Sequence, residues 1–179
     1  MAELADELIQ SGDEGVRRRV GIKTAVELSR IFWPDFAEVD DLVLVPWVKI
    51  VRTGDSENGL DLTGIESLQN HTHIIDLFKH EAGREPGEKD DCFYDWNHPD
   101  FALLCEVGKK LAQMWFLKLK VDFPQYRFRV YYTQEDDPIV RFHRVRPEEP
   151  CWLDEETWAA DIRLGKVIVY DTQESQENK

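Results

Sequence analysis

The stretch from Pro99 to Arg146 constrains the fold of this chain more than any other, because it predicts a long helix that leads into a β-hairpin. In the helical part, apolar residues recur at the i, i+3, i+4, i+7 spacing of one buried helix face. The members of this face are Leu104, Val107, Gly108, Leu111, Met114 and Trp115. A proline in the first turn and lysines toward the other end suit the two termini of a helix near 99–121.

A hairpin follows near 126–146, and in its first strand apolar and cationic residues alternate with the period of a half-buried strand. The second strand is harder to phase, because the apolar Ile139 and Val145 share a face with its cationic residues. Val140 and Phe142 define one face of its second strand. The first strand has an aromatic face that begins with Tyr126 and Phe128. If Val140 and Phe142 pair with this face, the cationic residues of both strands meet on one exposed surface. This candidate anion-binding set is Arg127, Arg129, Arg141 and His143. A shift of one residue in the hairpin register would scatter them.

The remaining elements predict an α+β fold, a single domain in which a small antiparallel sheet packs against helices. The regular strand and helix alternation of a parallel sheet is absent. We expect further helices near 26–32, 65–79 and 152–162 and a last strand near 166–172. Near 41–51 we expect one strand that is broken by Pro46, or two short strands.

The ends of the chain differ in composition from its centre. A Ser-Gly-Asp-Glu-Gly break follows a short amphipathic start, and the last residues are polar and without pattern. We therefore expect a flexible N-terminal arm at 1–15, one α+β domain at 16–172 and a disordered tail at 173–179.

The net charge of the chain limits the classes of partner that it is expected to bind. A formal net charge of -14 opposes binding to nucleic acid or to an anionic membrane surface, where Lys and Arg must neutralise phosphate. A basic protein is a better partner for such a surface, although an acidic surface also serves simply to keep a protein dissolved. The apolar runs are shorter than the roughly 20 residues of a membrane span. Three cysteines without paired spacing indicate a cytoplasmic protein with reduced thiols. The oligomeric state is left open.

The search for catalytic and metal motifs finds none that is complete. His80 and Glu81 begin like a zinc-peptidase helix, but Arg84 occupies the position of the second histidine. His71 and His73 are weak metal candidates, because residues two apart share a face on a strand but diverge on the helix expected there. No phosphate-binding loop or serine elbow occurs, so we expect no metal, no cofactor and no enzyme of those classes.

Two functional hypotheses follow. The first is a non-enzymatic protein-binding or regulatory module that engages a basic partner, since the chain is acidic and lacks an assembled catalytic motif. The alternative is a small enzyme or ligand-binding protein that holds an anionic substrate on the arginine-rich hairpin face. Like charges on neighbouring strands repel unless an anion neutralises them. That anion is either a ligand or one of the chain's own carboxylates.

Overall fold

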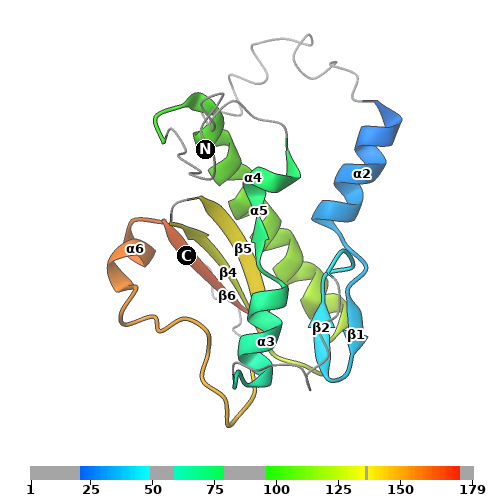
Figure 1. Ribbon diagram of the computed structural model, residues 1–179, viewed down its shortest axis with the longest axis vertical. Coiled ribbons are helices and arrows are strands. Elements are labelled where there is room, and N and C mark those ends of the chain that lie inside the picture. Colours follow the sequence, from blue (N-terminus) through cyan, green and yellow to red (C-terminus); the bar gives the residue numbers. More distant parts are fainter. Residues whose placement is uncertain (1–20, 49–58, 79–95, 136, 174–179) are drawn as a thin grey trace. The chain divides into compact units, whose positions relative to one another are not determined.

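One long helix and a four-stranded antiparallel sheet form the centre of the fold (Figure 1). The computed structural model describes residues 21–48, 59–78, 96–135 and 137–173. The chain divides into two compact units, Met1–Ile31 and Phe32–Lys179. Helices and antiparallel strands both occur in the second unit, so the predicted α+β class is confirmed.

The long helix is α5, Pro99–Asp122, and its ends are stabilised by the sequence around them. The Nδ1 atom of His98 accepts the Asp100 N–H at 3.1 Å and so caps the first turn, in which Pro99 needs no hydrogen-bond partner for its nitrogen. At the other end the Phe123 N–H donates to the Leu119 carbonyl at 3.0 Å. The helix predicted near 99–121 is therefore present with nearly the expected bounds.

The sheet has the strand order β3-β5-β4-β6, and all neighbouring strands are antiparallel. Its strands are β3 (Thr72–His73), β4 (Phe128–Gln134), β5 (Pro138–Arg144) and β6 (Val167–Asp171). In the hairpin Val130 pairs with Phe142 and Tyr132 with Val140, which is the register that gathers the apolar residues on one face.

The core lies between α5 and that apolar face. Trp115 is fully buried and makes edge-to-face contacts with Phe36 and Phe142, at ring-centroid distances of 5.9 Å and 6.0 Å. Helix α5 and the sheet lie close together at Gly108, where an added Cβ would lie 2.8 Å from the Tyr132 ring. Only glycine leaves room for that aromatic ring against the helix backbone.

Before the sheet, the strands β1 (Ala37–Val39) and β2 (Leu42–Leu44) form a tight hairpin. Asp40 and Asp41 make its two-residue turn with φ angles of 51° and 68°, as a type I′ turn requires. Near 41–51, where one strand broken by Pro46 or two short strands were expected, the described residues contain the short strand β2, which ends before Pro46. Residues 49–51 lie outside the described part of the chain.

Two of the expected helices differ from the structure. Residues 65–79 do not form one helix; the described part holds α3 (Leu62–Gln69), then β3, then the short α4 (Ile74–Leu77). Of residues 152–162, the first seven are bends and turns without a helix, and the helix α6 (Ala159–Arg163) begins only at Ala159. The helix expected near 26–32 is present as α2, Ile22–Phe32.

Several expectations fall outside the described residues, among them the flexible arm at 1–15 and all of the tail at 173–179 except Gln173. The domain bounds therefore stay a prediction. Among the described helices, none combines the length and the apolar character that crossing a membrane requires.

Candidate functional site

The cationic residues of the hairpin lie on the face of the sheet opposite α5, as the observed register dictates. Arg129 pairs with His143 and Tyr131 with Arg141 across the two strands. This second face is not exposed as expected, because an apolar cluster covers it. The cluster comprises Tyr131, Leu153 and Val167 with the partly buried Trp152, Trp158, Ile162 and Val169.

Arg127 and Arg129 are neutralised by the protein itself. Arg127 Nη2 lies 2.5 Å from Asp171 Oδ2, and its Nε donates to both oxygens of the same carboxylate. Arg129 Nη1 lies 2.7 Å from Glu155 Oε1, and its Nε lies 3.3 Å from Asp171. Two cations of the expected anion-binding set therefore face internal carboxylates on β6 and in the segment before α6.

His143 is fully buried, and both of its ring nitrogens have partners. The Trp152 N–H can only donate, so Nε2 accepts from it at 3.3 Å and lies 2.9 Å from the Tyr131 hydroxyl. Nδ1 then carries the proton and donates to the Arg144 carbonyl at 3.0 Å. Burial lowers the pKa of His143, and the charges of nearby arginines lower it further. A neutral His143 thus has no free nitrogen for a ligand.

Arg141 is the exception among these cations. It is 9% exposed, and its guanidinium lies over the Trp152 ring at 3.7 Å from the ring centroid. Its Nε has no hydrogen-bond partner, and among the described residues no carboxylate lies within ion-pair distance of it. Burial lowers the pKa of Arg141 to about 10, against the opposing charges of Glu135 and Asp137. Arg141 is thus a buried cation for which the described residues provide no direct counter-ion.

Two histidines lie beside Arg141 on the same face. Because Thr72 pairs with Val140 and His73 with Ile139, continuing the register places His71 opposite Arg141. The His71 Nε2 atom is buried and has no hydrogen-bond partner in the described part of the chain. Burial, together with the charges of Arg141 and His73, lowers the pKa of His71 to about 4, so this ring is neutral near pH 7.

His73 makes a hydrogen-bonding contact with the turn between β4 and β5. Its Nδ1 lies 2.6 Å from Asp137 Oδ2, and its ring centroid lies 4.3 Å from that of His71. The side chain of His73 is 39% exposed, whereas that of Asp137 is 8% exposed. We call these residues the Arg141 site, which comprises Arg141, His71, His73, Asp137 and Trp152.

The two histidines share a face, as the metal hypothesis requires of a strand, but further ligands do not join them. Asp137 occupies the Nδ1 side of His73. In the described parts of the chain, no group of three or more His, Cys, Asp or Glu side chains is arranged to hold a metal ion. The site therefore offers an imidazole pair and a guanidinium, which suits an anion better than a cation.

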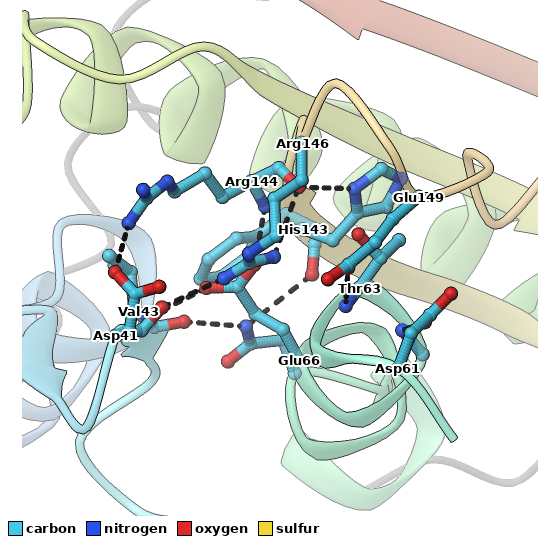
Figure 2. A network of polar contacts seen from close by, with 12 residues as sticks. Asp41, Val43, Asp61, Thr63, Glu66, His143, Arg144, Arg146 and Glu149 are labelled. Carbon is cyan, nitrogen blue, oxygen red and sulfur yellow. Dashed lines mark hydrogen bonds and ion pairs between the residues drawn. The ribbon is translucent and has the colours of Figure 1, made fainter. Parts of the chain in front are cut away.

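A second polar cluster, drawn in Figure 2, holds the end of β5 to the β1–β2 hairpin. The buried Glu66 carboxylate accepts the Val43 N–H at 2.6 Å, the Arg144 N–H at 2.5 Å and Arg146 Nη1 at 3.1 Å. Arg146 Nη2 in turn donates to the Asp41 carbonyl at 2.8 Å. Burial raises the pKa of Glu66 while these donors favour its charged form. The Glu66 carboxylate accepts hydrogen bonds from donors of the protein itself, and these bonds hold two segments together. We therefore interpret this cluster as structural.

A hollow of about 310 Å³ lies between α5 and the end of β4, and Cys105, Lys109, Glu135 and Lys166 contribute to its lining. Burial raises the pKa of the Cys105 thiol, whereas a nucleophilic cysteine needs a lowered one. Cys105 packs against the core as its helix position suggests.

Sequence reasoning identified Arg141, His71 and His73 separately but did not bring them together. Trp152 and Asp137 were missed, because a residue in a connection carries no periodic signal that places it over a sheet. Comparisons of this chain with protein-family models, with curated proteins and with solved structures find no match.

Proposed function

We propose that this protein binds a small oxyanion, such as the carboxylate of a metabolite, at the Arg141 site. The single observation that carries the proposal is the buried Arg141 guanidinium, which stacks on Trp152 and has no hydrogen-bonding carboxylate among the described residues. Burying an unpaired cation costs several kcal/mol even after the surrounding protein relaxes. A bound anion would remove much of that cost.

The chemistry of the Arg141 guanidinium and of the His71 imidazole supports this proposal. A guanidinium presents a planar fork of N–H donors that matches the two oxygens of a carboxylate. The neutral His71 ring has an unpartnered Nε2, which donates to an anion when it carries the ring proton. Trp152 holds the plane of the guanidinium in place through its contact at 3.7 Å.

The charge around the site favours a monoanion over a phosphate dianion. Glu135 and Asp137 act electrostatically on Arg141, and Asp137 also contacts His73 at 2.6 Å. A second negative charge on the ligand would meet these carboxylates without a further unpaired cation to balance it. We therefore expect acetate-like carboxylates to bind more tightly than inorganic phosphate.

The first test is native mass spectrometry of the protein purified at low salt, followed by calorimetric titration with acetate, benzoate and inorganic phosphate. Arg141→Met keeps the length and packing of the side chain but removes its charge, so carboxylate affinity should fall about tenfold or more. Arg163→Met removes the same charge from the exposed end of α6 and should leave the affinity unchanged. Far-UV circular dichroism checks that each variant is folded.

Arg141→Lys keeps the charge without the planar fork, and we expect it to bind the carboxylate with intermediate affinity. A wild-type protein that carries no retained anion and binds none of the three probes would overturn the proposal. Equal affinity in wild type and Arg141→Met would overturn it as well, because the anion would then sit elsewhere.

A second candidate is the acidic protein-binding module, which the distribution of charge favours. The net charge is -14, and Arg127, Arg129, Arg144 and Arg146 are all engaged with carboxylates of the chain itself. Association with a basic partner should weaken steeply as salt rises from about 50 to about 300 mM. The measurement is a pull-down with this protein as bait, and an unrelated acidic protein of equal charge is the control bait. If both baits capture the same proteins, recognition is not specific.

A further inference from the structure

Helix α5 carries a second apolar stripe on the side away from the sheet. Its buried residues face the core, yet Leu103, Leu117 and Val121 are 62%, 43% and 68% exposed. Val107 and Met114, which the helical spacing assigns to the buried face, are only half-buried and lie between them. We call this row the α5 seam, which comprises Leu103, Val107, Lys110, Met114, Leu117 and Val121.

The spacing of the α5 seam alternates between four residues and three over its whole length. That alternation is the signature of a helix that packs against another helix in a coiled-coil manner. Within the described residues, the elements that α5 packs against are α4 and the strands β4, β5 and β6, which lie on its buried side. The seam is therefore an apolar surface that these elements leave open.

We propose that the α5 seam binds the same seam of a second copy of this chain, antiparallel and about a two-fold axis. In this register Val121 packs against Leu103 of the partner subunit, and Leu117 against Val107 of the partner subunit. Met114 then packs against Lys110 of the partner subunit, so that the whole row is used. Such a contact is self-complementary, as a two-fold dimer requires.

The charges beside the seam fit this arrangement. Glu106, Gln113 and Lys120 are exposed and follow one edge of the seam at seven-residue intervals. The antiparallel register brings Glu106 next to Lys120 of the partner subunit at both ends of the interface. It also places Gln113 against Gln113 of the partner subunit at the centre. Opposite charges therefore meet twice, and the amides meet at the axis.

A parallel arrangement is disfavoured by the same residues. Parallel pairing would set Lys110 directly against Lys110 of the partner subunit in the middle of the seam, and two ammonium groups would repel there. In the antiparallel register the methylene chain of Lys110 covers Met114 of the partner subunit, and its charge reaches solvent. The seam spans about 27 Å at 1.5 Å per residue, so one helix pair makes a small interface with a micromolar dissociation constant.

Analytical ultracentrifugation of the full chain between about 1 and 200 µM tests the proposal, since it brackets a micromolar dissociation constant. We expect a reversible monomer–dimer equilibrium. Val121→Glu and Leu117→Glu place a charge in the seam at exposed positions and should each give a monomer. Lys110→Leu should tighten the dimer, because it removes the one charged member of the row.

The register is tested by exchanging charges. Glu106→Lys and Lys120→Glu should each weaken the dimer about tenfold, because like charges then meet at both ends. The double variant E106K/K120E restores opposite charges and should recover the wild-type affinity. Glu156→Lys makes the same change at an exposed position before α6 and serves as the control.

A protein that stays monomeric at every concentration would overturn the proposal. A dimer that withstands Val121→Glu and Leu117→Glu would show that another surface mediates it, which also overturns the proposal. If the double variant E106K/K120E does not recover the dimer affinity that the single variants lose, the antiparallel register is excluded. These outcomes are independent of anion binding at the Arg141 site.

Discussion

The carboxamide of Asn70 connects segments of backbone that lie far apart in the sequence. Its Oδ1 accepts the Val45 N–H at 3.0 Å, while its Nδ2 donates to the Val43 carbonyl at 2.8 Å and lies 3.4 Å from the Phe142 carbonyl oxygen. The residue is fully buried. The amide therefore supplies an acceptor and two donors, which no charged side chain of the same size can do.

Asn70→Asp should destabilise the fold by about 3 kcal/mol or more, because a carboxylate oxygen would replace the Nδ2 donor opposite two carbonyl oxygens. The measurement is the free energy of unfolding in urea at pH 7. Gln173→Glu makes the same chemical change at an exposed position and should alter that free energy by less than about 0.5 kcal/mol. Equal stability of Asn70→Asp and wild type would show that the observed hydrogen bonds contribute little.

Asp171 makes the fold sensitive to acid. Burial raises the pKa of Asp171, but hydrogen bonds from Arg127 and from the Gln173 backbone, together with the charge of Arg127, outweigh burial and hold it below its ordinary value. A carboxyl with a lowered pKa in the folded state stabilises the protein above its unfolded pKa. That stabilisation is lost as the pH falls through the folded pKa.

The stability of wild type should therefore decline below about pH 4, and Asp171→Asn should flatten that decline. At pH 7 the substitution should cost about 1–2 kcal/mol, since Arg127 is partly exposed to solvent. Urea unfolding at several pH values measures both effects, with the exposed Asp35→Asn as the control. An unchanged acid profile in Asp171→Asn would assign the acid sensitivity to other carboxyl groups.

At the residue scale, the alternation of the hairpin correctly predicts that Arg129, Arg141 and His143 share a face. It does not predict that the face is covered, because the residues that cover it lie in an irregular connection and in α6. A connection has no periodicity from which its contacts can be inferred. For the same reason the partner of His73, Asp137 in the hairpin turn, was not foreseen.

At the scale of the elements, Gly108 sets the distance between α5 and β4. An added Cβ would lie 2.8 Å from Tyr132 Cε2 and 3.2 Å from Ile74 Cγ1, and the Tyr132 ring is itself fully buried. Alanine favours a helix by about 1 kcal/mol over glycine, so an exposed site would gain stability from this change. Here the lack of space outweighs that preference.

Gly108→Ala should therefore lower the free energy of unfolding by about 1–3 kcal/mol. Glu27→Ala, at an exposed position of helix α2 and outside the α5 seam, is the control and should change stability by less than about 0.5 kcal/mol. Thermal and urea unfolding of both variants compare the two positions. A stabilised Gly108→Ala would mean that the helix shifts away from the sheet at little cost.

The region 65–79 shows why some elements could not be predicted from the sequence. Apolar residues on both sides of His71 resemble one helix, but α3 ends at Gln69, and the Asn70 amide donates toward Val43 of β2 and Phe142 of β5. Thr72 and His73 then pair with β5. Pairing with a strand more than sixty residues later in the chain is a tertiary interaction that local periodicity does not contain.

At the scale of the whole molecule, carboxylates outnumber cations, with 36 Asp and Glu against 22 Lys and Arg. Arg127, Arg129, Arg144 and Arg146 are engaged with carboxylates of the chain, with Arg146 at 9% exposure and its partner Glu66 at 0%. The surplus that gives the net charge of -14 is therefore left to the rest of the chain. Repulsion among these surplus charges opposes the compact state.

Added salt should therefore stabilise the monomer, because it screens exposed like charges more than buried ion pairs. We expect the midpoint of thermal unfolding to rise by a few degrees, about 2–5 °C, between about 20 and about 300 mM NaCl at pH 7 and low protein concentration. Near pH 4.7, where the net charge approaches zero, the same salt step should have little effect. A midpoint that falls with salt at pH 7 would show that attractive surface pairs outweigh the net repulsion.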